Sequence, residues 1–179
     1  LKQNKQAIIL VPEISLTPQT VRRFYARFPG KVALMHSGLS IGERYDTWRR
    51  VRSGALPVVV GARSALFAPV PAPGLIVVDE CHDGSYFQDD FRPHYSAVES
   101  AVAYSRLANI PLILGSATPT TEQLYRARRE KWHELRLPDR IFAGDGPWSI
   151  SLVDLLGRHA LPQPAALRAL PDAMLAFDG

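Results

Sequence analysis

Residues 75–82 read Leu-Ile-Val-Val-Asp-Glu-Cys-His, and residues 115–118, which follow the next apolar run, read Gly-Ser-Ala-Thr. Four consecutive apolar residues are typical of a strand buried on both faces of a parallel sheet. Asp79 and Glu80 then stand at its carboxyl end, where open α/β sheets bind their ligands. In a nucleotide site, Asp79 would hold Mg²⁺ and Glu80 would orient the attacking water. For the Asp-Glu pair alone, the alternative is an ordinary strand end with solvated acids.

The residues next to this pair favour the nucleotide interpretation. His82 could sense the γ-phosphate of a bound nucleotide and pass that state to Ser116 and Thr118 in the second motif. The two motifs in this order indicate a motor that couples nucleotide hydrolysis to movement along nucleic acid.

The composition of the chain limits the choice of protein class. With 179 residues, 46% of them apolar, the chain can bury one core, and it has no 18-residue apolar run that could cross a membrane. The single cysteine, Cys81, excludes an internal disulfide and suits a reducing cytoplasm. Residues 1–5 lack the apolar core of a signal peptide, and because the first residue is not Met, we expect a piece of a longer protein. The net charge of +4 is weakly in favour of a polyanionic partner.

Short apolar runs alternate with amphipathic stretches along the chain, which predicts an α/β fold with a parallel sheet flanked by helices. The expected strands are 7–11, 32–36, 58–60, 75–78 and 112–114. The expected helices begin at residues 18, 41, 95 and 121.

The helix after residue 40 has clear start and stop signals. Ser40 opens a capping box, and Gly54 ends the helix. We expect this helix to bury Tyr45, Trp48 and Val51.

The amino-acid composition of the sequence changes near the carboxyl end. Residues 1–137 are predicted to form the first domain, and the Pro, Gly and Asp content of residues 138–149 indicates a linker. A strand at 150–155 would begin a second lobe, which residues 150–179 are too few to complete.

Two segments that follow strands carry candidate contacts to nucleic acid. Ser15, Thr17 and Gln19 surround a helix amino terminus and could donate to a phosphate, or they could simply cap the helix. Arg63 and Ser64 follow the third strand, where they could contact phosphates or form a salt bridge and a turn.

An aromatic-rich stretch follows His82. Tyr86, Phe87, Phe91 and Arg92 lie in a predicted surface loop. Bases stack on aromatic rings and on guanidinium planes, so single-stranded nucleic acid resting here could signal to the hydrolytic site. Alternatively, the rings could fold back onto a neighbouring domain.

Taken together, these motifs resemble the first motor lobe of the PriA family of bacterial replication-restart helicases, also called primosomal protein N′, in helicase superfamily 2. The resemblance covers nearly the whole chain. The segments that carry it are 8–19, 36–40, 61–69, 79–96 and 115–119.

The resemblance implies a RecA-like sheet and assigns a role to each motif. Residues 10–19 match a DNA-contacting motif, 79–82 the DExH box, 83–95 an aromatic-rich coupling loop and 115–119 the motif that links hydrolysis to strand separation. Residues 152–155 match the start of the second lobe. The chain departs from the family at Cys81, where Glu is usual, and at Phe87 and His94, which replace basic residues.

The resemblance also implies ATP and Mg²⁺ as cofactors and a zinc module elsewhere in the parent protein. A Gly-x-x-x-x-Gly-Lys phosphate loop does not occur in residues 1–179, and by resemblance it should precede Leu1. We therefore expect residues 1–179 alone not to hydrolyse ATP.

Three hypotheses remain open from the sequence. The first is a fragment of an ATP-dependent 3′ to 5′ DNA helicase that initiates primosome assembly in replication restart, with single-stranded and forked DNA, primosome proteins and single-strand-binding proteins as partners. The second is a non-catalytic pseudohelicase that binds DNA structures and recruits partners. The third is a restriction-type translocase.

Overall fold

The computed structural model describes residues 4–90 and 92–137. The chain divides into two units, Leu1–Trp132 and His133–Gly179. The fold below is that of the first unit. The predicted linker at 138–149 and the predicted start of a second lobe at 150–179, including its strand at 150–155, lie outside the described residues.

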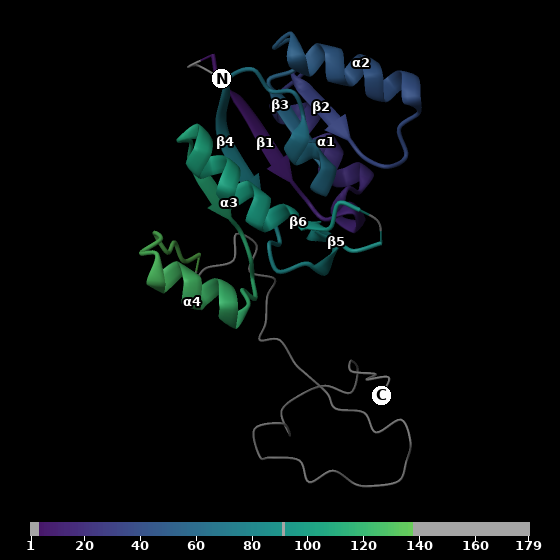
Figure 1. Cartoon of the computed structure of the whole chain (residues 1–179). Helices are drawn as coiled ribbons and strands as arrows, with labels where there is room; N and C mark the ends of the chain where they lie inside the picture. The colour runs from purple at the N-terminus through teal and green to yellow at the C-terminus, as the bar shows by residue number, and fades with distance from the viewer. Residues whose placement is uncertain (1–3, 91, 138–179) are drawn as a thin grey trace, which may run out of the picture. The chain divides into compact units, whose positions relative to one another are not determined.

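A parallel sheet forms the centre of the first unit (Figure 1). Its strand order is β2-β3-β1-β4-β7. The sheet confirms the predicted α/β class, and each strand lies within two residues of its predicted limits. The strands are β1 (Gln6–Leu10), β2 (Val32–Met35), β3 (Val58–Gly61), β4 (Pro73–Val78) and β7 (Leu112–Leu114).

The four predicted helices are also present. They are α1 (Pro18–Arg27), α2 (Ile41–Arg52), α3 (Ala97–Ala108) and α4 (Thr121–Arg129). Each begins behind a polar N-cap side chain, and the Ser40–Glu43 capping box of α2 is complete in both directions. The structure therefore confirms the predicted helix starts at residues 18, 41 and 121, whereas the third helix begins at Ala97 instead of residue 95 because Tyr95 and Ser96 form a strand.

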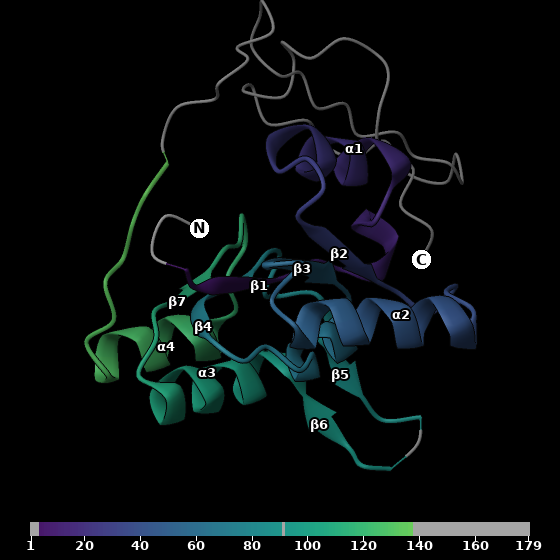
Figure 2. The same cartoon turned by 90° about the horizontal axis from the view of Figure 1, so that it is seen from above.

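The helices cover the two faces of the sheet unequally. Figure 2 shows α1 on one side of the sheet and α2 and α3 on the other. Because side chains alternate along a strand, Ile8 and Leu10 pack toward α2 and α3, whereas Ile9 packs with the α1 side. On the α1 side, Val77 and Ile113 occupy the same register row as Ile9.

The α1 face is not covered as far as β7. In Figure 2, α1 lies over β2 and β3, at the other end of the sheet from β7. Ile113 is accordingly 49% exposed, and Val77 is only half-buried. Among the described residues, the face of β4 and β7 on this side is therefore an open apolar surface.

The prediction that α2 buries Tyr45, Trp48 and Val51 is wrong for the two aromatic residues. Val51 is fully buried, but Tyr45 is 61% and Trp48 37% exposed. Residues three apart differ by about 60° around a helix, so Tyr45 and Val51 point about 120° apart. The two rings instead contact the guanidinium groups of Arg49 and Arg52.

The segments between these elements contain short ordered pieces that the sequence did not indicate. Phe87 and Gln88 pair with Ser96 and Tyr95 in a small antiparallel hairpin. The short pieces are the 3-10 turns η1 (Glu13–Ser15), η2 (Arg63–Phe67) and η3 (Gly84–Tyr86) and the hairpin strands β5 (Phe87–Gln88) and β6 (Tyr95–Ser96).

Gly61 ends β3 at a position that has no room for a side chain. A Cβ atom built there would lie 2.2 Å from the Met35 carbonyl oxygen and 2.7 Å from the Ala65 Cβ. The Met35 carbonyl also accepts a hydrogen bond from the Ala62 amide at 3.3 Å. Glycine is required here by close packing, because no heavier residue fits between β2 and η2.

We predict that Gly61→Ala destabilises the chain by roughly 1–3 kcal/mol, because a methyl group must displace main-chain atoms. Gly42→Ala is the matched control, since nothing lies within 4 Å of its Cβ position in α2. This control should be neutral or stabilising by up to about 1 kcal/mol. Urea unfolding followed by circular dichroism measures both, and equal stabilities for the two variants would contradict the packing argument.

Candidate functional site

The last residues of the five sheet strands lie in one row. Strand register pairs Met35 with Gly61, Gly61 with Leu10, Leu10 with Val78, and Val78 with Leu114. All five strands run parallel, so the next residues along the chain emerge at one edge of the sheet. The segments that carry the predicted motifs therefore start side by side at this edge.

The turn after β4 is fixed by hydrogen bonds to strands on both sides. The Asp79 amide donates to the Leu10 carbonyl at 2.9 Å, and the Cys81 amide donates to the Gly115 carbonyl at 2.8 Å. Within the turn, the Asp79 carboxylate accepts from the Glu80 amide at 3.1 Å. Glu80 has φ of 46°, in the left-handed region that residues with a side chain seldom occupy. The turn is thus a rigid support for two carboxylates.

Gly115 lies beside the Asp79 carboxylate. A Cβ atom at Gly115 would lie 3.4 Å from Oδ1 of Asp79. Asp79 itself is exposed. Its carboxylate is therefore accessible to a ligand that approaches the edge of the sheet.

His82 and Ser116, which were predicted to communicate, are in direct contact. Nδ1 of His82 and Oγ of Ser116 share a hydrogen bond of 2.7 Å, and the Thr118 amide donates to the same Oγ at 3.0 Å. Nδ1 of His82 also lies 3.5 Å from a carboxylate oxygen of Glu80. The structure therefore brings together Glu80, His82, Ser116 and Thr118.

Gln123 joins this group, although the sequence analysis did not include it. Its side-chain amide donates to the Cys81 carbonyl at 2.8 Å, while its carbonyl oxygen accepts from the Thr120 amide at 3.0 Å. Thr120 and Gln123 form the capping box of α4. This Thr-x-x-Gln pattern was the signal that could have drawn attention to Gln123, which links α4 to the turn after β4.

Tyr86 was predicted to lie in an exposed loop and stack on bases, and its position contradicts that prediction. Only 2% of Tyr86 is exposed, and its hydroxyl donates to the Asp79 carbonyl at 2.7 Å. Burial raises the pKa of the hydroxyl well above its ordinary value, and the Asp79 carboxylate adds to the shift. The ring is inside because the hydroxyl finds a main-chain acceptor there.

The neighbours of Tyr86 differ from it in exposure to solvent. Phe87 is 51% exposed and Arg92 is exposed, so both are accessible, whereas Phe91 lies outside the described residues. Phe67, on η2, is 61% exposed and packs edge-on against Tyr95 with ring centroids 5.3 Å apart. Phe67 is a second accessible ring at this edge that the sequence analysis did not select.

Arg63 points toward the aromatic-rich segment. Its Nη1 donates to the main-chain carbonyls of Ser85 at 3.3 Å and Phe87 at 2.9 Å. Ser64, the neighbouring candidate, is exposed. The sequence had suggested either a phosphate contact or a salt bridge for Arg63. The structure instead shows contacts to main-chain carbonyls.

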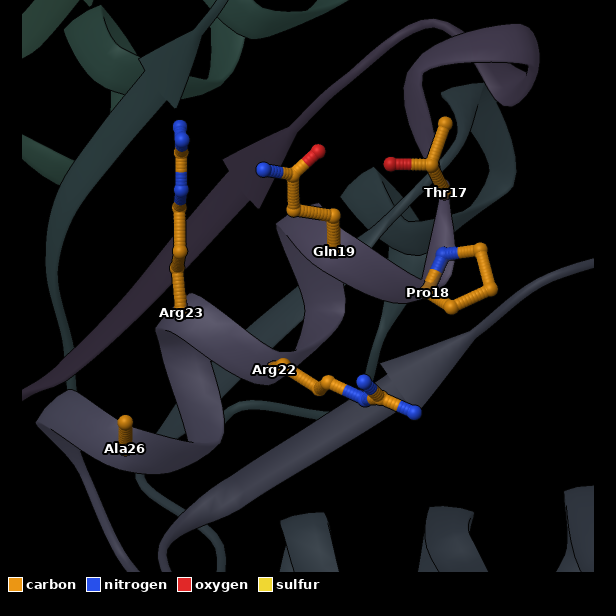
Figure 3. Close-up of a pocket in the computed structure, with 6 residues that line it drawn as sticks. All are labelled: Thr17, Pro18, Gln19, Arg22, Arg23 and Ala26. Atoms are coloured by element: carbon orange, nitrogen blue, oxygen red, sulfur yellow. The ribbon is translucent and has the colours of Figure 1, made fainter.

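The candidates at the start of α1 line a separate, open pocket (Figure 3). Oγ1 of Thr17 accepts from the Thr20 amide at 3.3 Å and so caps the helix. Ser15 is half-buried in η1. In Figure 3 the guanidinium of Arg22 extends away from that of Arg23. The pocket is lined by Thr17, Pro18, Gln19, Arg22, Arg23 and Ala26.

Two kinds of feature are absent from the part of the chain that the structure describes. No group of three or more His, Cys, Asp or Glu side chains in 4–90 and 92–137 is arranged to hold a metal ion. No helix in the same part of the chain is long and apolar enough to cross a membrane.

Comparison with known proteins finds similarity to helicases and to replication restart proteins. The family model for DEAD/DEAH box helicases matches residues 1–127. The replication restart protein PriA of Bacillus subtilis is 48% identical over 155 residues, which are 87% of this chain and 19% of that protein. The protein of the same name from Synechocystis is 45% identical over 159 residues, with the same two coverages. The chain thus spans about a fifth of the length of these relatives.

Among solved structures, the chain is similar to the Hef helicase domain of Pyrococcus furiosus. The TM-score is 0.46 and the identity is 23%, with 70% of this chain and 26% of that chain covered.

We predict that Tyr86→Phe lowers the free energy of unfolding by about 1 kcal/mol, because the variant removes one buried hydrogen bond and leaves the Asp79 carbonyl without its donor. Tyr125→Phe is the control, since Tyr125 is 65% exposed. Urea unfolding measures both variants. A Tyr86→Phe variant as stable as the control would show that the hydroxyl contact contributes nothing.

Proposed function

This chain belongs to the DEAD/DEAH box helicase family, and from that premise we propose that it is the first motor lobe of an ATP-dependent 3′ to 5′ DNA helicase. The names of the relatives favour a role in replication restart. In that role, we propose, the enzyme remodels stalled forks and initiates primosome assembly. The observation that carries the proposal is the row of strand ends, which sets the Asp79-Glu80 turn beside the His82–Ser116 hydrogen bond.

ATP and Mg²⁺ are the proposed cofactors, and the residues at the turn fit them. The Asp79 carboxylate is exposed, and carboxylate oxygens are the kind of ligand that Mg²⁺ prefers. When bound, Mg²⁺ neutralises charge that develops on the phosphoryl oxygens. Asp79 would hold the ion, and the Glu80 carboxylate, held by its strained backbone, would orient the attacking water.

Communication within the lobe is proposed to run through His82. Its imidazole contacts both Glu80 and Ser116, so a change at the carboxylates reaches the segment that precedes α4. Ser116 in turn fixes the Thr118 amide. We propose that this chain of contacts links hydrolysis to movement of the lobe.

Single-stranded and forked DNA are the nucleic acids that we propose the lobe binds and moves along. Phe87 and Phe67 offer exposed rings for base stacking, and Arg92 offers an exposed guanidinium; Phe91 is retained as a candidate from the sequence alone. Ser64 and the residues around the α1 pocket would contact phosphates. The proposed phosphate contacts on α1 and η1 are Ser15, Thr17, Gln19, Arg22 and Arg23.

The remaining features are proposed for the parent protein rather than for this lobe. They are a cytoplasmic location, a zinc module outside this chain, and primosome and single-strand-binding proteins as partners. They rest on the similarity to the PriA proteins.

In the longer protein that contains both lobes, we predict that Asp79→Asn or Glu80→Gln lowers DNA-stimulated ATP hydrolysis by about a hundredfold or more, because each removes a carboxylate with a proposed chemical role. Asp46→Asn, on the exposed part of α2, is the control. A coupled ATPase assay with single-stranded DNA measures the rates. Normal turnover in either active-site variant would favour the non-catalytic scaffold.

We also predict that residues 1–179 by themselves bind ATP·Mg²⁺ too weakly for calorimetry at micromolar concentrations. Most nucleotide affinity in such sites comes from the backbone cradle and lysine of a phosphate loop, and this sequence contains no such motif. Micromolar binding would mean that the nucleotide site lies elsewhere in the lobe.

A further inference from the structure

Arg63 and Tyr86 both hold the same short stretch of main chain. The Arg63 guanidinium donates to the carbonyls of Ser85 and Phe87, the residues on either side of Tyr86. The Tyr86 ring lies in the core, where its hydroxyl donates to the Asp79 carbonyl. Residues 85–87 are therefore fixed both by the Arg63 guanidinium and by the buried Tyr86 ring.

This arrangement determines which ring reaches the surface. With Tyr86 inserted and its two neighbouring carbonyls turned toward Arg63, Phe87 is left half-exposed at the start of β5. Arg63 is the first residue of η2, which follows β3, whereas residues 85–87 follow β4. The contact therefore joins segments that leave the sheet edge at two different strands. Two of its hydrogen-bonding directions are already used by main-chain carbonyls.

We propose that Arg63 is a positioning residue rather than a phosphate contact. It holds residues 85–87 in the conformation that presents Phe87 to single-stranded DNA while Tyr86 stays in contact with the main chain of Asp79. A base that stacks on Phe87 then acts on the catalytic turn through Tyr86. This regulatory role rests on the proposed helicase function. The bracing itself, by which we mean the fixing of residues 85–87 by the two Arg63 hydrogen bonds, does not.

The bracing can be tested in the 179-residue chain without DNA or nucleotide. Hydrogen exchange measured by mass spectrometry on peptides covering residues 83–90 should become about tenfold faster or more in Arg63→Ala, because two hydrogen bonds from a charged donor are lost. Arg50→Ala, an exposed arginine of α2, is the matched control and should leave these peptides unchanged. Unchanged exchange in Arg63→Ala would overturn the proposal.

The role toward DNA is tested in the longer protein through the salt dependence of binding. Loss of a phosphate contact reduces the slope of log K against log salt by about 0.7 for single-stranded DNA. If Arg63 only positions residues 85–87, Arg63→Ala should leave the slope of log K against log salt unchanged. It should raise the DNA concentration that half-activates the ATPase by about tenfold. Arg63→Lys separates the two roles, since an ammonium preserves the charge of a phosphate contact but ends a shorter side chain than the one that carries Nη1 to both carbonyls.

The possible outcomes are distinct. Faster exchange in Arg63→Ala, an unchanged salt slope and an intermediate activation defect in Arg63→Lys would support the proposal. A reduced slope in Arg63→Ala that Arg63→Lys restores would overturn it in favour of direct phosphate contact. If the unaltered longer protein shows no DNA-stimulated hydrolysis, the helicase function fails, and the exchange result alone decides whether Arg63 is a brace.

Discussion

Parallel pairing of the five sheet strands in a common register is the constraint on which the rest of the site depends. Met35, Gly61, Leu10, Val78 and Leu114 occupy one row, so five separate segments leave the sheet at the same level. Small changes in this row would move whole segments, because each strand residue spans about 3.3 Å. The absence of a side chain at Gly61 lets β2, β3 and η2 approach closely enough to keep the row intact.

The polar groups at this edge are held mainly through main-chain atoms. The Asp79 and Cys81 amides bond to strands on either side of β4, and Tyr86 and Gln123 each donate to a carbonyl of the same turn. The Asp79 carboxylate thereby stays exposed, while the His82 imidazole contacts Ser116 and Glu80. A support of this kind fixes the main chain from which the reactive side chains extend, and hydrogen bonds such as that between His82 and Ser116 then fix the side chains themselves.

Local patterns predicted the elements of the fold, and long-range contacts account for what they missed. Apolar runs and capping residues were sufficient to find the strands and helices, because both signals act within a few residues. The insertion of Tyr86 depends on an acceptor at Asp79, seven residues away, and the orientation of Arg63 on carbonyls more than twenty residues further along the chain. On α2, Tyr45 and Trp48 looked like core residues, but only Val51 points toward the sheet.

The uncovered part of the sheet has a consequence for handling the lobe in solution. Among the described residues, β7 forms one edge of the sheet, it consists of Leu, Ile and Leu, and the α1-side face next to it has no covering helix. An uncharged edge strand beside an apolar face lacks the features by which proteins prevent edge-to-edge pairing. We therefore expect this segment by itself to self-associate at high concentration, and we expect Ile113→Lys to improve its solubility.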